Sequence, residues 1–92
     1  MRPPRFTMLQ VIWEDPPARA FDRFPERTQE AIYRALARFA AYREGDVKAL
    51  KGRLAGFHRL RVGEYRILFR LSPAEEAMIV VGAFPRGSAY RE

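Results

Sequence analysis

The sequence predicts an α+β fold in which two N-terminal helices pack on a small, twisted, mostly antiparallel β-sheet. An apolar repeat at helical spacing occupies the first half of the chain, and short alternating apolar segments separated by glycines occupy the second half. The expected order of elements is β-α-α-β-β-β. Ninety-two residues suffice for one modest core, so we expect residues 1–92 to form a single domain.

Residues 7–13, "TMLQVIW", are predicted to form the first strand, because Leu9, Val11 and Trp13 alternate toward one side. Asp15 followed by two prolines is a helix-start signal: an acidic capping residue precedes positions where a missing N–H costs nothing. A short helix is therefore expected through Phe21.

Pro25 opens the second and longer predicted helix. Its apolar residues at helical spacing are Ile32, Ala35, Leu36 and Phe39. Gly45-Asp46 is expected to end this helix, with glycine accepting the left-handed cap conformation.

Three further strands are expected at residues 57–62, 65–71 and 78–84. Gly63-Glu64 suits a two-residue hairpin turn between the first two of them. Residues 78–84 are apolar on both sides and β-branched in the middle, which predicts a strand inside the sheet.

This hairpin register places Arg61 directly opposite Arg66. One face then carries an apolar layer: Leu60, Val62, Tyr65, Ile67 and Phe69. The other face carries Phe57, Arg59, Arg61, Arg66, Leu68 and Arg70.

Opposed like charges, such as Arg61 and Arg66, cost roughly 0.2–1 kcal/mol. A phosphate held between the two guanidinium groups would remove this conflict, since arginine binds phosphate oxygens in pairs. The alternatives are neutralisation by helix glutamates, or arginines lying over apolar surface.

The positive charge is concentrated in the second half of the chain. Residues 1–46 carry eight Lys/Arg and seven Asp/Glu, a net of +1, whereas residues 47–92 carry nine and four, a net of +5. Residues 47–71 contain seven basic residues and one acidic residue. Such a stripe is typical of a polyanion partner, with a solvated, solubilising face as the alternative.

Several functional classes find no support in the sequence. There is no cysteine, and the single histidine, His58, falls by parity on the apolar side of its strand, where packing is expected. We therefore expect no metal site and no cofactor. The apolar run at residues 77–84 is too short to span a bilayer, which predicts a soluble, cytoplasmic protein with no membrane partner.

The segments "VKALKGRLAGFHRLRVGEYRILFRL" and "MIVVGAFPRGSAYRE" resemble the RelE/ParE superfamily of bacterial toxin–antitoxin toxins, and "DPPARAFDRFPERTQEAIYRAL" resembles its helical hairpin. The RelE branch implies a metal-independent endoribonuclease, an mRNA interferase that cleaves mRNA in the translating ribosome. The ParE branch implies a binding protein that inhibits DNA gyrase. A third alternative is a degenerate, non-toxic member. All three imply a cognate acidic antitoxin as partner.

The resemblance also implies site residues. Arg66, Arg86 and Tyr90 match the catalytic positions of the nuclease branch. The expected RNA-binding residues are Lys48, Lys51, Arg53, Phe57, Arg59 and Arg61. Nuclease relatives often carry "GHR" or "GKR" where this chain reads "GAFPR", and this departure favours the degenerate member.

Overall fold

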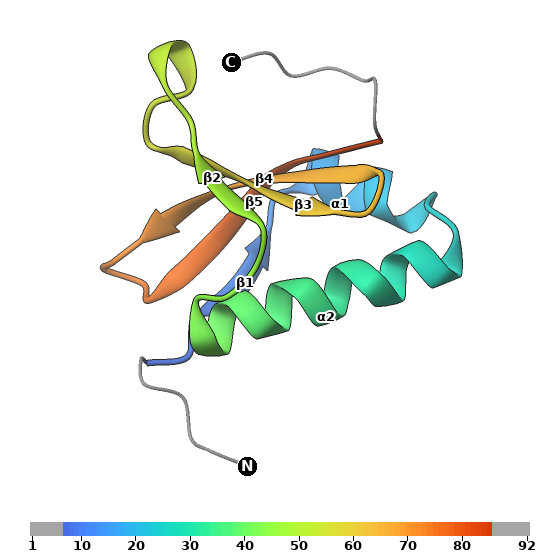
Figure 1. Cartoon of the computed structure of the whole chain (residues 1–92), viewed down its shortest axis with the longest axis horizontal. Helices are drawn as coiled ribbons and strands as arrows, with labels where there is room; N and C mark the ends of the chain where they lie inside the picture. Colours follow the sequence, from blue (N-terminus) through green and yellow to red (C-terminus); the bar gives the residue numbers. More distant parts are fainter. Residues whose placement is uncertain (1–6, 86–92) are drawn as a thin grey trace.

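The computed structural model describes residues 7–85, which form one five-stranded sheet with both helices on the same face (Figure 1). The strand order is β1-β5-β4-β3-β2. β1 runs parallel to β5, and every other neighbouring pair is antiparallel. The predicted α+β class and its mostly antiparallel sheet are thus confirmed. No helix among the described residues is long and apolar enough to cross a membrane.

The elements follow one another in the predicted order with one short strand added. Their bounds are β1 Gln10–Trp13, α1 Asp15–Asp22, α2 Glu26–Tyr42, β2 Val47–Ala49, the 3-10 turn η1 Gly52–Leu54, β3 Phe57–Val62, β4 Tyr65–Ser72 and β5 Ala77–Pro85.

The core lies between α2 and the sheet. α2 buries Ile32, Leu36 and Phe39 at helical spacing, as its sequence predicts. Facing them, β3 and β4 contribute residues that are almost fully buried: Leu60, Ile67 and Phe69. β5 lies between β1 and β4, so its interior position is also confirmed.

The C-terminal end of α2 differs from its prediction. Arg43, rather than Gly45, adopts the left-handed cap conformation, with φ of 57°. The side chain explains why a non-glycine residue is tolerated there. Its guanidinium donates hydrogen bonds to the carbonyl of Ala40 at 2.6 Å and to that of Thr7 at 2.9 Å, which satisfies a carbonyl in the last turn of the helix.

The N-terminal boundaries are also corrected. β1 begins at Gln10 rather than at residue 7, because only residues 10–13 pair with β5. α1 includes Asp15 as its first residue, and its N-cap is Glu14, whose side chain makes no capping hydrogen bond. The short strand β2, absent from the prediction, pairs with β3 through Val47–Ala49.

Gln29 ties the two helices together. Its side-chain amide donates to the carbonyls of Phe21 at 3.0 Å and Phe24 at 3.2 Å, at the end of α1 and in the linker that follows.

Gln29→Met removes both bonds and leaves part-buried carbonyl groups without this donor. We expect the free energy of unfolding in urea to fall by about 1–3 kcal/mol. Gln10→Met, at an exposed position, is the matched control and should change the free energy of unfolding by less than about 0.5 kcal/mol. Equal effects would contradict the role of Gln29.

Candidate functional site

The candidate site begins at the β3–β4 hairpin, whose register is the predicted one: Arg61 pairs with Arg66 and Leu60 with Ile67. The backbone N–H of Arg61 donates to the carbonyl of Asp46, 2.9 Å away, and therefore points toward the β2 side. Arg61 and Arg66 are consequently a non-hydrogen-bonded pair, the arrangement in which opposite side chains come closest. The like-charge contact predicted from the sequence is thus as close as a sheet allows.

An open polar pocket lies at this end of the hairpin, lined by Arg61, Gly63, Glu64 and Arg66. Gly63 has φ of 57°, which the tight turn requires and glycine adopts without strain. Arg66 is half-buried, and its Nη1 donates to the carbonyl of Tyr65 at 3.3 Å. Arg61 is exposed. The two guanidinium groups thus approach one space from adjacent strands.

Arg59, two residues before Arg61, has a different environment. Its side chain is only 14% exposed, and Nη1 lies 3.3 Å from both the carbonyl oxygen and a carboxylate oxygen of Asp46. Lys48 of β2 is its register partner on the other side. Asp46 therefore already supplies Arg59 with an anionic partner, whereas Arg61 and Arg66 line a pocket.

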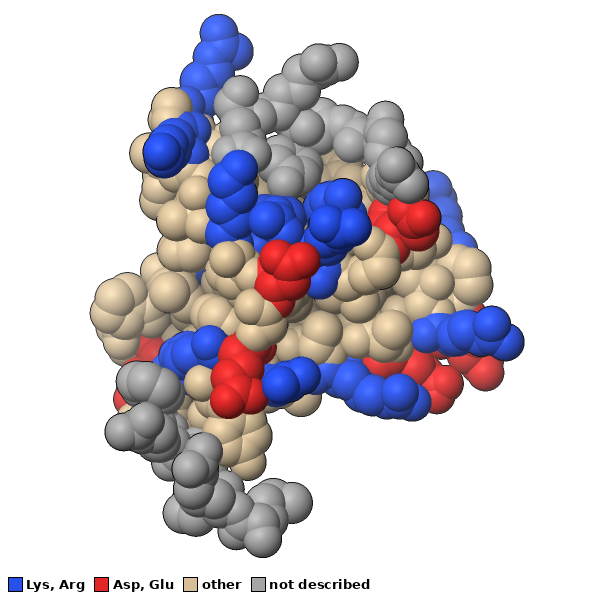
Figure 2. Space-filling model, in the orientation of Figure 1, with Lys and Arg blue, Asp and Glu red and all other residues tan. Residues whose placement is uncertain are grey.

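The sheet face opposite the helices, here called the arginine face, carries Arg59, Arg61, Arg66 and Arg70. Figure 2 shows Lys and Arg side chains gathered over β2 and β3, whereas charges of both signs alternate along α2. There, Arg34 pairs with Glu30 at 3.9 Å and Arg38 with Glu44 at 3.1 Å. The helix residue Glu30 thus has its own partner on the other side of the molecule. On the arginine face, Asp46 pairs with Arg59, and Glu64 lines the pocket together with Arg61 and Arg66.

The remaining predicted site residues lie further from this pocket. Lys51 and Arg53 are exposed, next to and within η1, on the segment that projects from the body in Figure 1. Phe57 is half-buried at the opposite end of β3, paired with Arg70. Arg86 and Tyr90 lie outside the described residues.

His58 is packed as the sequence predicts. Its ring stacks on Phe69 with centroids 5.3 Å apart. Its Nδ1 is buried and has no hydrogen-bond partner among the described residues. Within the same residues, no group of three or more His, Cys, Asp or Glu side chains could hold a metal ion.

Phe84 is a residue of the arginine face that sequence reasoning missed. A β-bulge at Val81 shifts the pairing, so that Val80 lies opposite Phe69 but Phe84 lies opposite Arg66. In regular alternation, Phe84 would share the core side with Val80. The signal of this bulge is that two core residues of one strand, Val80 and Ala83, are three positions apart instead of two or four. The sequence does not reveal this spacing, because residues 77–84 are apolar or glycine throughout and show no alternation.

Comparison with solved structures identifies the fold. The RelBE2 toxin–antitoxin complex from Mycobacterium tuberculosis contains a chain that matches 92% of this one over 99% of its own length, with a TM-score of 0.79 and 20% identity. A chain of a RelE–RelB complex from Pyrococcus horikoshii matches 89% of this chain over 99% of its own length, with a TM-score of 0.73 and 21% identity. The isolated RelE toxin of Escherichia coli matches 88% of this chain over 87% of its own length, with a TM-score of 0.70 and 10% identity.

At the level of sequence, no family model and no curated protein matches the chain. The structural similarities nevertheless extend over most of both chains in each comparison. They confirm the expected architecture, and the chain has the fold of the RelE toxins.

Proposed function

We propose that this protein is the toxin of a toxin–antitoxin pair and cleaves mRNA in the translating ribosome without a metal ion. The observation that carries the proposal is the Arg61–Arg66 pair, two guanidinium groups held side by side in one open pocket on a RelE fold. Two of the similar structures are complexes of a toxin with its antitoxin, which supports an antitoxin partner for this chain.

The chemistry follows from the charge of the pocket. RNA cleavage by the 2′-hydroxyl group builds negative charge on the scissile phosphate, and guanidinium groups positioned there in advance stabilise that charge. Guanidinium remains protonated, so Arg61 and Arg66 supply electrostatic stabilisation and not general-base catalysis. Glu64 is the one residue among those described around this pocket whose side chain can accept a proton.

An acidic antitoxin suits the same surface. A segment rich in Asp and Glu would neutralise the arginine face and compete with RNA for Arg61 and Arg66. Such a partner would thus inhibit the toxin by occupying the phosphate site itself.

Sulfate tests the pocket directly, because it is a tetrahedral anion like phosphate. We expect sodium sulfate to raise the unfolding temperature of the wild type above its value in sodium chloride of equal ionic strength, since a ligand that binds only the native state stabilises it. Arg61→Ala and Arg66→Ala should each lose most of this difference. Without sulfate, Arg61→Ala should be more stable than the wild type by about 0.2–1 kcal/mol, because the opposed charges are gone.

Arg59→Ala is the matched control for these two variants. Because Asp46 already holds the Arg59 guanidinium, this variant should keep the sulfate response while losing stability. A sulfate response that is unchanged in all three variants would contradict the anion site.

The reaction itself is tested by mapping the 5′ ends of mRNA in bacterial cells after induction of the protein. We expect new ends inside translated coding regions with the wild type, and at least about tenfold fewer with Arg66→Ala. Loss of one oxyanion donor typically costs about 10²–10³ in rate, which sets the scale of that reduction.

Other outcomes separate the alternatives. Arrested growth without new ends would reject the nuclease and direct the search to gyrase. Normal growth without new ends would identify a degenerate, non-toxic member that keeps the fold and only binds an antitoxin.

A further inference from the structure

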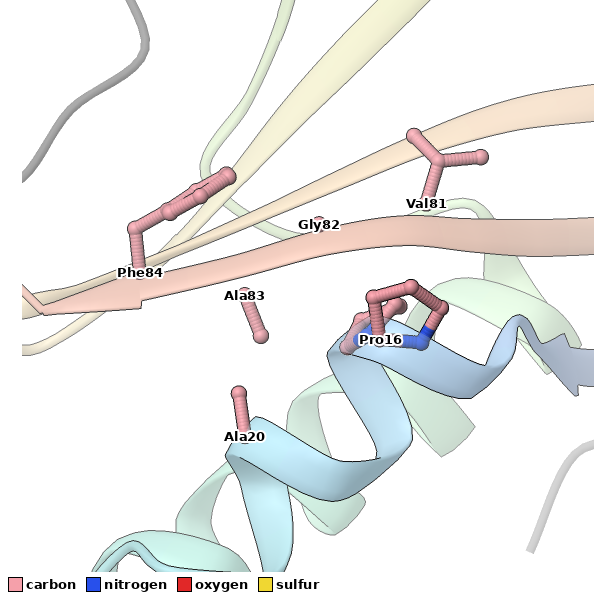
Figure 3. Close-up of a pocket in the computed structure, with 7 residues that line it drawn as sticks. Pro16, Ala20, Val81, Gly82, Ala83 and Phe84 are labelled. Carbon is pink, nitrogen blue, oxygen red and sulfur yellow. The ribbon is translucent and has the colours of Figure 1, made fainter.

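A second, apolar pocket lies between α1 and the C-terminal half of β5. β1 pairs only with residues 77–80 of β5, and α1 begins where that pairing ends. The space beyond is a pocket of about 120 Å³ between α1 and β5, bounded by Pro16 and Ala20 on one side and by Gly82, Ala83 and Phe84 on the other (Figure 3).

The aromatic ring of Phe84 rests directly on Gly82. A Cβ atom built on Gly82 would lie 2.5 Å from Cε2 and 2.8 Å from Cζ of that ring, closer than real Cβ contacts. Glycine at position 82 therefore allows the ring to lie over β5, the strand that borders the pocket. Figure 3 shows the ring on the same side of the β5 ribbon as Val81, with Ala83 directed to the other side, toward Ala20.

Phe84 and Arg66 are register partners on adjacent strands, which lie about 4.7–4.9 Å apart. Because partners project to the same face, the side chains of Phe84 and Arg66 are neighbours on the arginine face. Arg66 lines the polar pocket and Phe84 lines the apolar one, so this pair of register partners links the two pockets.

We propose that the apolar pocket takes one nucleobase of the RNA whose phosphate lies between Arg61 and Arg66, with the base against Phe84. This inference rests on the proposed function and adds a base-binding subsite to it. Single-stranded RNA is recognised largely by bases stacked on aromatic side chains, beside cationic groups that hold the backbone. A closed, dry cavity of about 150 Å³ binds benzene. The present pocket, of about 120 Å³, is smaller but open to solvent, so it can take one edge of a planar base while the rest of the base stays outside.

The test measures binding of the full chain to a fluorescein-labelled single-stranded RNA hexamer by fluorescence anisotropy. The same hexamer is prepared with an abasic ribose at each position in turn. We expect the wild type to bind the intact RNA about 5- to 150-fold more tightly than one of the abasic forms, the range that corresponds to 1–3 kcal/mol per stacked base.

Three variants isolate the contribution of Phe84. Phe84→Leu should bind the intact RNA only as tightly as the wild type binds that abasic form. Gly82→Ala, which displaces the ring without removing it, should lose affinity in the same way. Phe24→Leu changes a half-buried phenylalanine between α1 and α2, packed against the core, and should bind like the wild type. Urea midpoints show whether each variant is folded.

The result that would overturn the inference is equal binding of all RNAs by Phe84→Leu and the wild type. If Arg66→Ala still weakened binding in that experiment, the phosphate site and the proposed function would stand without the base subsite. Unchanged RNA binding by Phe84→Leu, with loss of binding to a labelled peptide of alternating Glu and Leu, would assign the pocket to an acidic protein partner. If Phe84→Leu and Arg66→Ala both bound RNA as tightly as the wild type, both proposals would be overturned.

Discussion

The register of the β3–β4 hairpin is the constraint on which the other features depend. Side chains alternate along a strand, so the register that buries Leu60 and Ile67 also brings Arg61 opposite Arg66. Burial of one such aliphatic side chain contributes about 1.5–3 kcal/mol, whereas an opposed pair of like charges costs about 0.2–1 kcal/mol. Burial of the core therefore outweighs the repulsion, and it fixes the two arginines opposite each other without any ligand.

Asp46 divides the arginines into two groups. Its carbonyl accepts the Arg61 N–H and, together with its carboxylate, receives the Arg59 guanidinium. The first bond fixes β2 beside β3, and the second neutralises Arg59, whose side chain is largely buried. Arg59 is thus held by the protein itself, while Arg61 and Arg66 face the pocket. The same basic stripe therefore supports both the fold and the proposed phosphate site.

Sequence reasoning predicted the features that local chemistry determines. The glycine turn and the strict alternation of residues 57–70 were enough for the hairpin register, the opposed arginines and the packed His58. The left-handed cap could not be predicted, because Arg43 replaces glycine there through bonds to Ala40 and to distant Thr7. β2 was missed because three residues carry too little pattern, and its pairing with β3 is a tertiary effect.

The bulge at Val81 shows how two independent features build the proposed site. The turn at Gly63 places Arg66, whereas the bulge reverses the alternation of β5 and brings Phe84 to the arginine face beside it. A bulge re-aims side chains at the expense of one regular pairing, and here the core loses little because Ala83 takes the buried position instead. Gly82 completes the arrangement, because any larger residue would occupy the place of the ring. A phosphate-binding pair and an aromatic wall thus meet on neighbouring strands, although no contiguous motif in the sequence joins them.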